Sequence, residues 1–239
     1  MKAVIGLDPG HGGSYSGTYS CNTVKDGLFE KDYCLELCLM IEERLLANGF
    51  GAVLSRRTDV FPGNVSKRAG KMIENKVDFA LSVHFNGFEK QSANGCEVFV
   101  PYGEKLAGIE CGFYKELGKY FSRREPFARA NSFYDRNKVF DKELNLATRR
   151  FDAFDKTGKD YFGFVRDCWA AGISADLLEI CFLTNPADFA AYKANTERIA
   201  DGIARSIVEG FGEKYFFEKG ETKKAGPKIR PRHKIDVIK

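Results

Sequence analysis

Short apolar runs of strand length alternate along this chain with longer segments in which apolar residues recur at the spacing of a helix face. The strand-length runs fall at residues 3–7, 52–54, 79–85, 96–100, 161–165 and 175–183. The helix-period segments fall at residues 30–48, 66–75, 104–121 and 186–211. Strands that alternate with helices are typical of α/β proteins. The pattern therefore predicts a single α/β domain, with a twisted, mostly parallel or mixed sheet of about six strands flanked by helices.

Residues at the ends of these segments support the boundaries. Gly49 follows the first long helical segment and suits a C-terminal cap. Asn185 precedes the last helical segment as an N-cap, with Pro186 at the first helical position. Asp188 then lies near the positive end of that helix dipole, which favours a carboxylate.

Two stretches lack a clear pattern. Residues 122–158 are rich in Arg, Asp and Phe, with weak helical periodicity at 143–154, and we expect an inserted loop-and-helix region there. Residues 219–239 are a mixture of Lys, Pro, Gly and Arg that cannot form a core, which predicts a tail or linker. We therefore expect a catalytic body over residues 1–218 and a basic tail over 219–239.

The composition is that of an ordinary folded protein, with 44% apolar and 29% charged residues. No apolar run approaches the ~20 residues that a membrane-crossing helix needs, so no membrane span is expected. The apolar part of residues 1–8 is too short for a secretion signal. The sequence therefore predicts synthesis in the cytoplasm without a signal peptide.

The net charge of +4 is unevenly distributed. The tail carries eight lysines and arginines and two acids, a net charge of +6, which leaves −2 for residues 1–218. A body that is close to neutral does not indicate a nucleic-acid-binding surface, and no nucleic acid partner is expected.

The seven cysteines are scattered along the chain and form no Cys-x-x-Cys pair. An odd number without metal-ligand spacing argues against both a disulfide framework and a four-thiolate zinc site. We expect reduced thiols, most of them packed as small buried hydrophobic side chains.

Glu30 is an ionisable residue in a position that a hydrophobic core does not favour. At 100° per helical residue, Cys34, Leu37 and Ile41 project within about 40° of Glu30, so its carboxylate lies on the apolar face. A buried carboxylate needs a cation, a metal ion or a proton. The alternative is a first-turn residue that the helix dipole favours and that reaches solvent.

His84 and Glu179 are similar cases in strands. His84 ends the central strand-length run, where open α/β sheets place their ligands, although a hydrogen-bonded core histidine is the alternative. Glu179 lies inside an apolar strand, where desolvation should raise its pKa towards that of a general base. A buried ion pair with an arginine such as Arg166 is the alternative for Glu179.

His11 follows the first strand in the sequence Asp-Pro-Gly-His-Gly-Gly, where it is either a turn residue or a fourth functional group. Two histidines and one carboxylate with an open position are the ligands of many hydrolytic zinc sites. A further glutamate that does not bind the metal then moves the proton. His11, Glu30, His84 and Glu179 supply these groups, although their spacing alone is a weak signal.

Four ordered motifs make the signal specific. They are the Asp-Pro-Gly-His-Gly-Gly sequence at 8–13, Glu30 at a helix start, Ser-Val-His-Phe-Asn at 82–86 and Leu-Glu-Ile-Cys-Phe-Leu-Thr-Asn-Pro-Ala-Asp at 178–188. Together they resemble the zinc-dependent N-acetylmuramoyl-L-alanine amidases of the amidase type 3 family. The segment Leu54–Asp59, with Arg68 and Asn75 after it, is similar to a further signature of that family. The resemblance extends to about residue 212.

The resemblance implies a single α/β domain, zinc held by His11, Glu30 and His84, and Glu179 as the catalytic glutamate. The chain departs from the family pattern at Cys181, where the family often has glycine, and in residues 122–158, which are longer than a minimal member needs. The implied substrate is peptidoglycan, cut at the amide between N-acetylmuramic acid and L-alanine. A wall-cleaving enzyme made without an export signal is expected to be a phage endolysin that reaches the cell wall after release, which we prefer, or a mother-cell enzyme of a sporulating bacterium.

The sequence alone leaves two alternative functions open. A zinc carboxypeptidase or other amidohydrolase would use the same groups, and a non-catalytic wall-binding module could share the fold. The basic tail either adheres to anionic wall polymers or is a disordered end.

Overall fold

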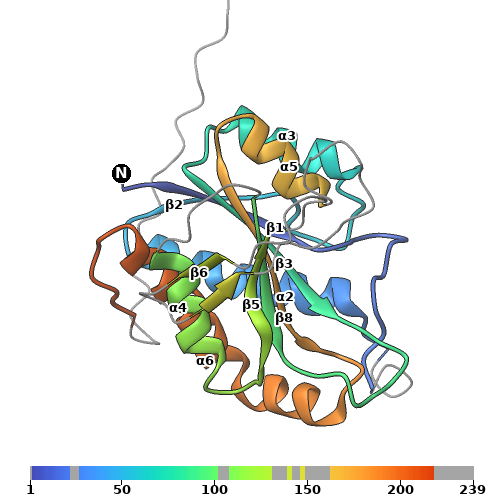
Figure 1. Ribbon diagram of the computed structural model, residues 1–239. Coiled ribbons are helices and arrows are strands. Elements are labelled where there is room, and N and C mark those ends of the chain that lie inside the picture. The colour runs from blue at the N-terminus through green and yellow to red at the C-terminus, as the bar shows by residue number, and fades with distance from the viewer. Residues whose placement is uncertain are drawn as a thin grey trace, which may run out of the picture.

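A six-stranded sheet with the strand order β2-β1-β3-β8-β4-β5 forms the centre of the computed structural model (Figure 1). The structure describes residues 2–21, 27–101, 108–130, 139–141, 146–148 and 162–217. The sheet strands are β1 (Val4–Pro9), β2 (Gly51–Leu54), β3 (Phe79–Asn86), β4 (Cys96–Val100), β5 (Arg123–Ala130) and β8 (Ser174–Phe182). The first four strands of that order are mutually parallel, whereas β4 is antiparallel to β8 and parallel to β5. The sheet is therefore mixed and mostly parallel, as predicted.

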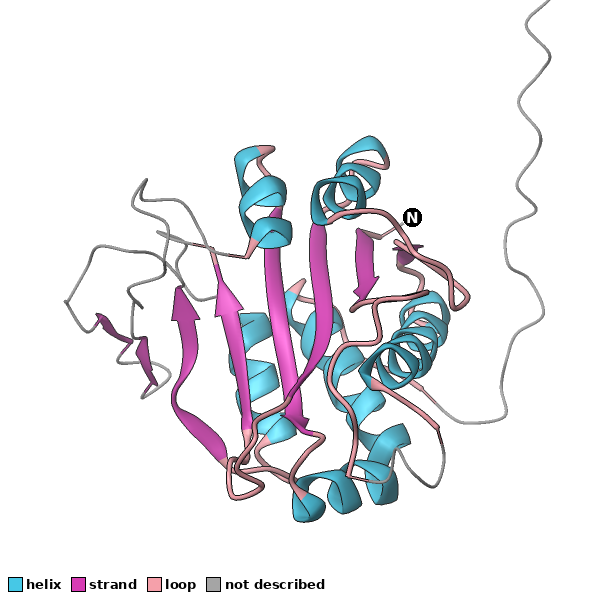
Figure 2. Cartoon of the chain, turned by 90° about the vertical axis from the view of Figure 1, so that its right-hand side faces the viewer, coloured by secondary structure: helices cyan, strands magenta, loops and turns pink. Residues whose placement is uncertain are grey.

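Helices cover both faces of this sheet (Figure 2). The helices are α2 (Glu30–Ala47), α3 (Val65–Glu74), α4 (Gly108–Leu117), α5 (Gly163–Ala170) and α6 (Pro186–Gly210). Strands β6 (Val139–Asp141) and β7 (Leu146–Thr148) pair separately as a small antiparallel sheet. None of the helices in the described ranges is long and apolar enough to cross a membrane.

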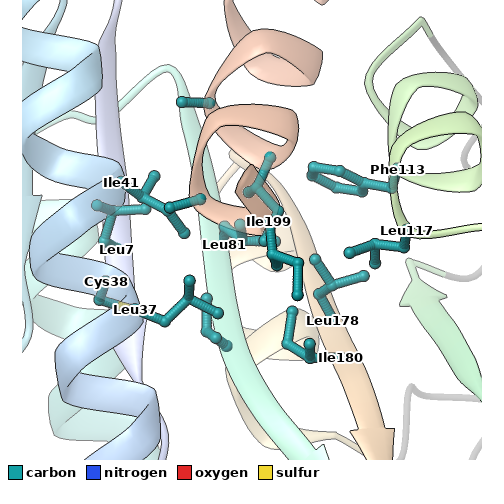
Figure 3. Packing of buried hydrophobic residues seen from close by; sticks show 14 of the residues in the cluster. Leu7, Leu37, Cys38, Ile41, Leu81, Phe113, Leu117, Leu178, Ile180 and Ile199 are labelled. Atoms are coloured by element: carbon teal, nitrogen blue, oxygen red, sulfur yellow. The ribbon is translucent and has the colours of Figure 1, made fainter. Parts of the chain in front are cut away.

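The larger core lies between the sheet and helices α2, α4 and α6 (Figure 3). Leu81 and Leu178 from the sheet meet Leu37 of α2, Phe113 of α4 and Ile199 of α6 there. A smaller core on the opposite face joins the sheet to α3 and α5, and Met72 and Cys168 belong to it. Successive side chains of β3 and β8 point to opposite faces of the sheet, so the same strands contribute residues to both cores.

The predicted boundaries agree with the structure within a few residues for most elements. Gly49, with φ of +80°, follows the C-terminus of α2 in the left-handed conformation expected of a cap. Asn185 caps α6 by accepting hydrogen bonds from the backbone N–H groups of Ala187 and Asp188. Five of the seven cysteines are buried, and none is in a disulfide.

Two predictions are wrong. Residues 161–165 were expected to form a strand, but α5 begins at Gly163, and Phe164, Val165 and Cys168 pack one helical face against the smaller core. The apolar run was too short to distinguish a strand from a helix. The weak helical periodicity at 143–154 is also misleading at its centre, because residues 146–148 form β7; the rest of that stretch lies outside the described residues. The sixth sheet strand is instead β5, a charged edge strand that contains proline, as edge strands tolerate.

Candidate metal centre and its surroundings

The sheet topology brings His11 and His84 to one place. Asp8 and Pro9 at the end of β1 are register partners of Ser82 and Val83 on β3, so the residues that follow lie side by side. His11 comes two residues after β1 ends, and the centres of its ring and that of His84 are 5.0 Å apart. The carboxyl ends of adjacent parallel strands thus form the site, as is usual in open α/β sheets.

The carboxylate of Glu30, the first residue of α2, lies between the two imidazoles. Its Oε1 is 3.1 Å from His11 Nε2 and 3.0 Å from His84 Nδ1. One potential ligand atom from each of the three residues lies within 4.8 Å of the others, so the group could hold a metal ion. Glu30 is 3% exposed, which shows that it does not reach solvent as a simple first-turn residue would.

Two backbone N–H groups orient the Glu30 carboxylate, and the two histidines keep it ionised. The N–H of Thr18 donates to Oε2 at 2.8 Å, and that of Phe85 donates to Oε1 at 3.1 Å. Burial by itself would raise the pKa of Glu30, but hydrogen bonds from His11 and His84 outweigh it and hold this pKa well below its usual range. A charged carboxylate beside two imidazoles is a suitable donor set for zinc.

Glycines allow the backbone to pack directly against these three side chains. A Cβ on Gly10 would lie 2.6 Å from the His84 ring. A Cβ on Gly17, whose φ is +68°, would lie 2.5 Å from Glu30 Oε2 and 2.6 Å from the His11 ring. The site is therefore enclosed by main chain on this side, and the donor set together with this enclosure fits a zinc ion with an open position.

Arg56 ties together the two segments that carry His11 and Glu30. Its guanidinium donates to the carbonyl oxygens of Gly10 at 2.7 Å and Lys31 at 2.6 Å, and more weakly to that of Pro9 at 3.3 Å. Arg56 is only 3% exposed, so these carbonyl bonds replace its hydration. This arginine fixes the His11 loop relative to the start of α2.

Asp8 fixes the base of the same loop. Its buried carboxylate accepts two hydrogen bonds from Arg68, at 2.8 and 2.6 Å, and one each from Ser55 and Ser82. Arg68 also donates to the carbonyl oxygen of Pro9 at 3.2 Å. The network explains why Arg56 and Arg68 accompany the histidine motif in the sequence.

Glu179 lies next to His84 on the neighbouring strand. The two residues are register partners on β8 and β3, so their side chains project from the same face of the sheet. Desolvation raises the pKa of Glu179 well above its usual value, and the negative charges of Glu30 and Glu97 add to the effect. Its Oε2 is buried and has no hydrogen-bond partner among the described residues.

The alternative ion pair of Glu179 with Arg166 does not form. Arg166 pairs instead with Asp167, with 3.2 Å between Nε and Oδ1. Across the part of the chain that the structure describes, no lysine or arginine is close enough to lower the pKa of Glu179.

Two residues beside Glu179, Glu97 and Arg124, were not identified from the sequence. Glu97 on β4 is the register partner of Glu179 and is 4% exposed. Its Oε1 accepts from Asn86 Nδ2 at 3.0 Å and lies 2.9 Å from Arg124 Nε. A glutamate inside the apolar run 96–100 is the same signal that identified Glu179, and it could have found Glu97.

A mixed α/β sheet that brings together two histidines, a carboxylate at a helix start and a separate half-buried glutamate is the arrangement of a zinc-dependent hydrolase. The sequence defines the family more closely. The family description "N-acetylmuramoyl-L-alanine amidase" matches residues 5–209, and the chain belongs to this family, the zinc-dependent amidases of type 3.

Known proteins with this description are similar to the chain. The N-acetylmuramoyl-L-alanine amidase LytC of Bacillus subtilis (strain 168) is 35% identical over 95 residues, which are 40% of this chain and 18% of LytC. A putative N-acetylmuramoyl-L-alanine amidase of Buchnera aphidicola subsp. Acyrthosiphon pisum is 30% identical over 240 residues, covering 90% of this chain and 95% of that protein.

A solved structure has the same fold. The catalytic domain of CwlV, an N-acetylmuramoyl-L-alanine amidase from Bacillus (Paenibacillus) polymyxa, superposes with a TM-score of 0.63. It is 23% identical in sequence, and the match covers 90% of this chain and all of that domain. The resemblance to the amidase type 3 family and the predicted fold class are thereby confirmed.

Proposed function

We propose that this chain hydrolyses the amide between the lactyl group of N-acetylmuramic acid and the L-alanine of the peptidoglycan stem peptide. The observation that supports this most directly is the position of Glu179, a half-buried glutamate on the strand next to the one that carries His84 of the cluster of two histidines and a carboxylate. Membership of the amidase family supplies the identity of the bond.

The metal ligands in this proposal are His11, Glu30 and His84. Zinc bound there would polarise the scissile carbonyl and lower the pKa of a water molecule. The backbone donors from Thr18 and Phe85 orient the Glu30 carboxylate, and hydrogen bonds with His11 and His84 keep its pKa low, so the carboxylate is ionised and in place for a cation.

Glu179 is the proton carrier. Because burial raises its pKa, its carboxylate can take a proton from the attacking water near neutral pH and release it again. The same oxygen then passes that proton to the nitrogen of the alanine that leaves. The hydrogen bonds to Asp8 and from Arg56 keep the ligand loop still while this occurs.

Product analysis tests the proposal. Zinc-loaded protein is incubated with purified peptidoglycan, and the soluble products are identified by mass and by reaction of new amines. An amidase produces a free lactyl acid on the sugar and a free α-amine on L-alanine. Release of carboxyl-terminal amino acids would favour the carboxypeptidase alternative, and no product in the zinc-loaded sample would favour a binding module.

The proposed substrate places the action of the enzyme at the bacterial cell wall. Synthesis in the cytoplasm and release in the manner of a phage endolysin stay predictions. The basic tail at 219–239 lies outside the described residues, and its binding to anionic wall polymers stays a prediction as well.

A further inference from the structure

A row of polar side chains continues across the sheet beyond Glu179. His84 pairs in register with Glu179, and Glu179 pairs with Glu97, so the three share one face. Arg124 extends the row on β5 through its ion pair with Glu97. The metal cluster therefore stands at one end of the row and a guanidinium at the other.

The guanidinium of Arg124 is held in place from two sides. Glu97, which is itself fixed by Asn86, pairs with Nε of Arg124 at 2.9 Å. The aromatic ring of Phe182 lies 5.2 Å from the guanidinium carbon. A cation fixed by a buried carboxylate and an aromatic ring loses little freedom when it binds a ligand.

The Arg124 side chain nevertheless stays 35% exposed, whereas that of Glu97 is 5% exposed. Guanidinium groups can pair with two carboxylates at once because their donors form a planar fork. Arg44 of this protein does so, with Asp201 on Nε and Glu197 on Nη2. Among the described residues Arg124 thus has one carboxylate partner, and its part-exposed side chain is suited to a second.

The separation between Glu179 and Arg124 suits a short piece of peptide. Neighbouring strands are about 4.8 Å apart, so β5 lies roughly 10 Å from β8, and the arginine side chain covers part of that distance. An extended peptide advances about 3.5 Å per residue. A carboxylate on the second residue after the scissile amide therefore comes within reach of the guanidinium.

We propose that Arg124, positioned by Glu97, binds the free α-carboxylate of the second residue of the stem peptide, a γ-linked D-glutamate. This inference rests on the proposed function. It places the peptide over β4 and β5 and the sugar on the side of β1. It also predicts that the enzyme distinguishes substrates with D-glutamate from those in which this carboxylate is amidated to D-isoglutamine.

Two muramyl tripeptides that differ only at that carboxylate test the proposal. One carries γ-linked D-glutamate and the other D-isoglutamine, and kcat and KM are measured for both with the zinc-loaded full chain. A charge-assisted hydrogen bond predicts a preference of ~10- to 100-fold in kcat/KM for the acid. Arg124→Gln is expected to reduce this preference to about one, through KM for the acid, with kcat changed less than about threefold.

Arg123→Gln is the matched control. Arg123 precedes Arg124 on the same strand, but its Nε donates to the carbonyl oxygen of Tyr114 at 2.9 Å, and its guanidinium lies 4.1 Å from that tyrosine ring. Because alternate residues of a strand face opposite sides, Arg123 does not belong to the row. The control is expected to keep the full preference for the acid.

The outcomes are distinguishable. Equal kcat/KM of the unmodified protein on the two tripeptides, or an unchanged preference in Arg124→Gln, overturns the role of Arg124 while the amidase activity stands. If neither tripeptide is cut, the proposed function fails and the inference fails with it. If Arg124→Gln does not fold, Arg124→Lys replaces it, because lysine keeps the charge without the planar fork. A preference for the acid that is smaller than that of the wild type but greater than one is then expected, and an unchanged preference overturns the role of Arg124.

Discussion

His84 and Glu179 are register partners on two neighbouring parallel strands, so a proposed metal ligand and the proposed base stand one strand apart on the same face of the sheet. Their backbones are fixed by the ladder between β3 and β8 rather than by a loop. The distance between the two groups is consequently set by strand spacing, which side-chain substitutions leave unchanged.

Glu179→Gln is therefore expected to keep the zinc and lose the activity. The amide has nearly the shape of the carboxylate but cannot take a proton, and loss of a general base lowers kcat by about 10²- to 10⁴-fold. Zinc content by elemental analysis and release of peptide from peptidoglycan are measured on the same preparation. A variant with wild-type kcat would remove Glu179 from the mechanism.

His84→Ala is expected to lose the metal. The substitution removes one of three proposed ligands, and even outer-shell changes weaken metal binding by about 10- to 100-fold, so a ligand change should exceed that. Zinc affinity is measured by competition with a chromogenic chelator. Adding zinc back to chelator-treated wild type should restore activity, and unchanged zinc affinity in the variant would refute the assignment.

Arg56→Met is expected to weaken zinc binding by about 10- to 100-fold, because Arg56 holds the His11 loop against the start of α2. Arg44→Met is the control, since Arg44 is an equally buried arginine whose carboxylate partners Glu197 and Asp201 lie on α6. Both variants should lose stability, by roughly 1.5–3 kcal/mol.

Only the Arg56 variant should lose metal affinity. Thermal unfolding and chelator competition separate the two effects, and the absorption spectrum of the cobalt-substituted protein reports the ligand geometry directly. Equal zinc affinities of the two variants at a temperature where both are folded would show that Arg56 acts on stability alone.

The seven cysteine thiols should divide into a group that reacts slowly with a thiol reagent and a group that reacts fast. Burial raises the pKa of Cys96 to about 12 and that of Cys168 to about 12, and it raises those of Cys34, Cys38 and Cys181 well above the ordinary value. Only the thiolate reacts, so these five should be nearly inert in the native protein at pH 8.

Reaction with a disulfide reagent such as DTNB checks this. The half-buried Cys21 and Cys111 are expected to react within minutes, and all seven cysteines only after unfolding in guanidinium chloride. Fast reaction of four or more thiols in the native protein would contradict the buried environment.

Removal of residues 219–239 tests the basic tail. If the tail adheres to anionic wall polymers, the shortened chain should pellet less with purified cell walls at low salt. The difference should disappear in high salt, where charges are screened. Equal pelleting of both chains at low salt would favour a tail without this role.

Much of this site could be predicted from the sequence because charged groups in apolar segments are costly and therefore informative. Glu30 and Glu179 were identified on that ground, and in the structure Glu30 is buried and Glu179 is half-buried. Arg56 and Asp8 were visible only as parts of motifs, since their roles depend on carbonyls and side chains that are far away in the sequence.

The errors in the fold have a common origin. Whether residues 161–165 and 123–130 form strands depends on which other segments they pair with in the folded protein. The local sequence pattern does not contain that information. β5 is charged because it lies at the sheet edge, so its sequence lacks the apolar alternation of an inner strand.

The register between β3 and β8 shifts beyond His84 and Glu179. His84 is opposite Glu179, but Asn86 is opposite Phe182, so β8 uses three residues where β3 uses two. The extra residue inverts the alternation of β8 and turns Phe182 to the side of Glu179, beneath Arg124. Ile180 and Cys181, adjacent in the sequence, both pack in the larger core. Deletion of Cys181 would restore simple alternation and leave Phe182 on the side of Glu179, so the extra residue adds a buried side chain to the core without moving the ring away from Arg124.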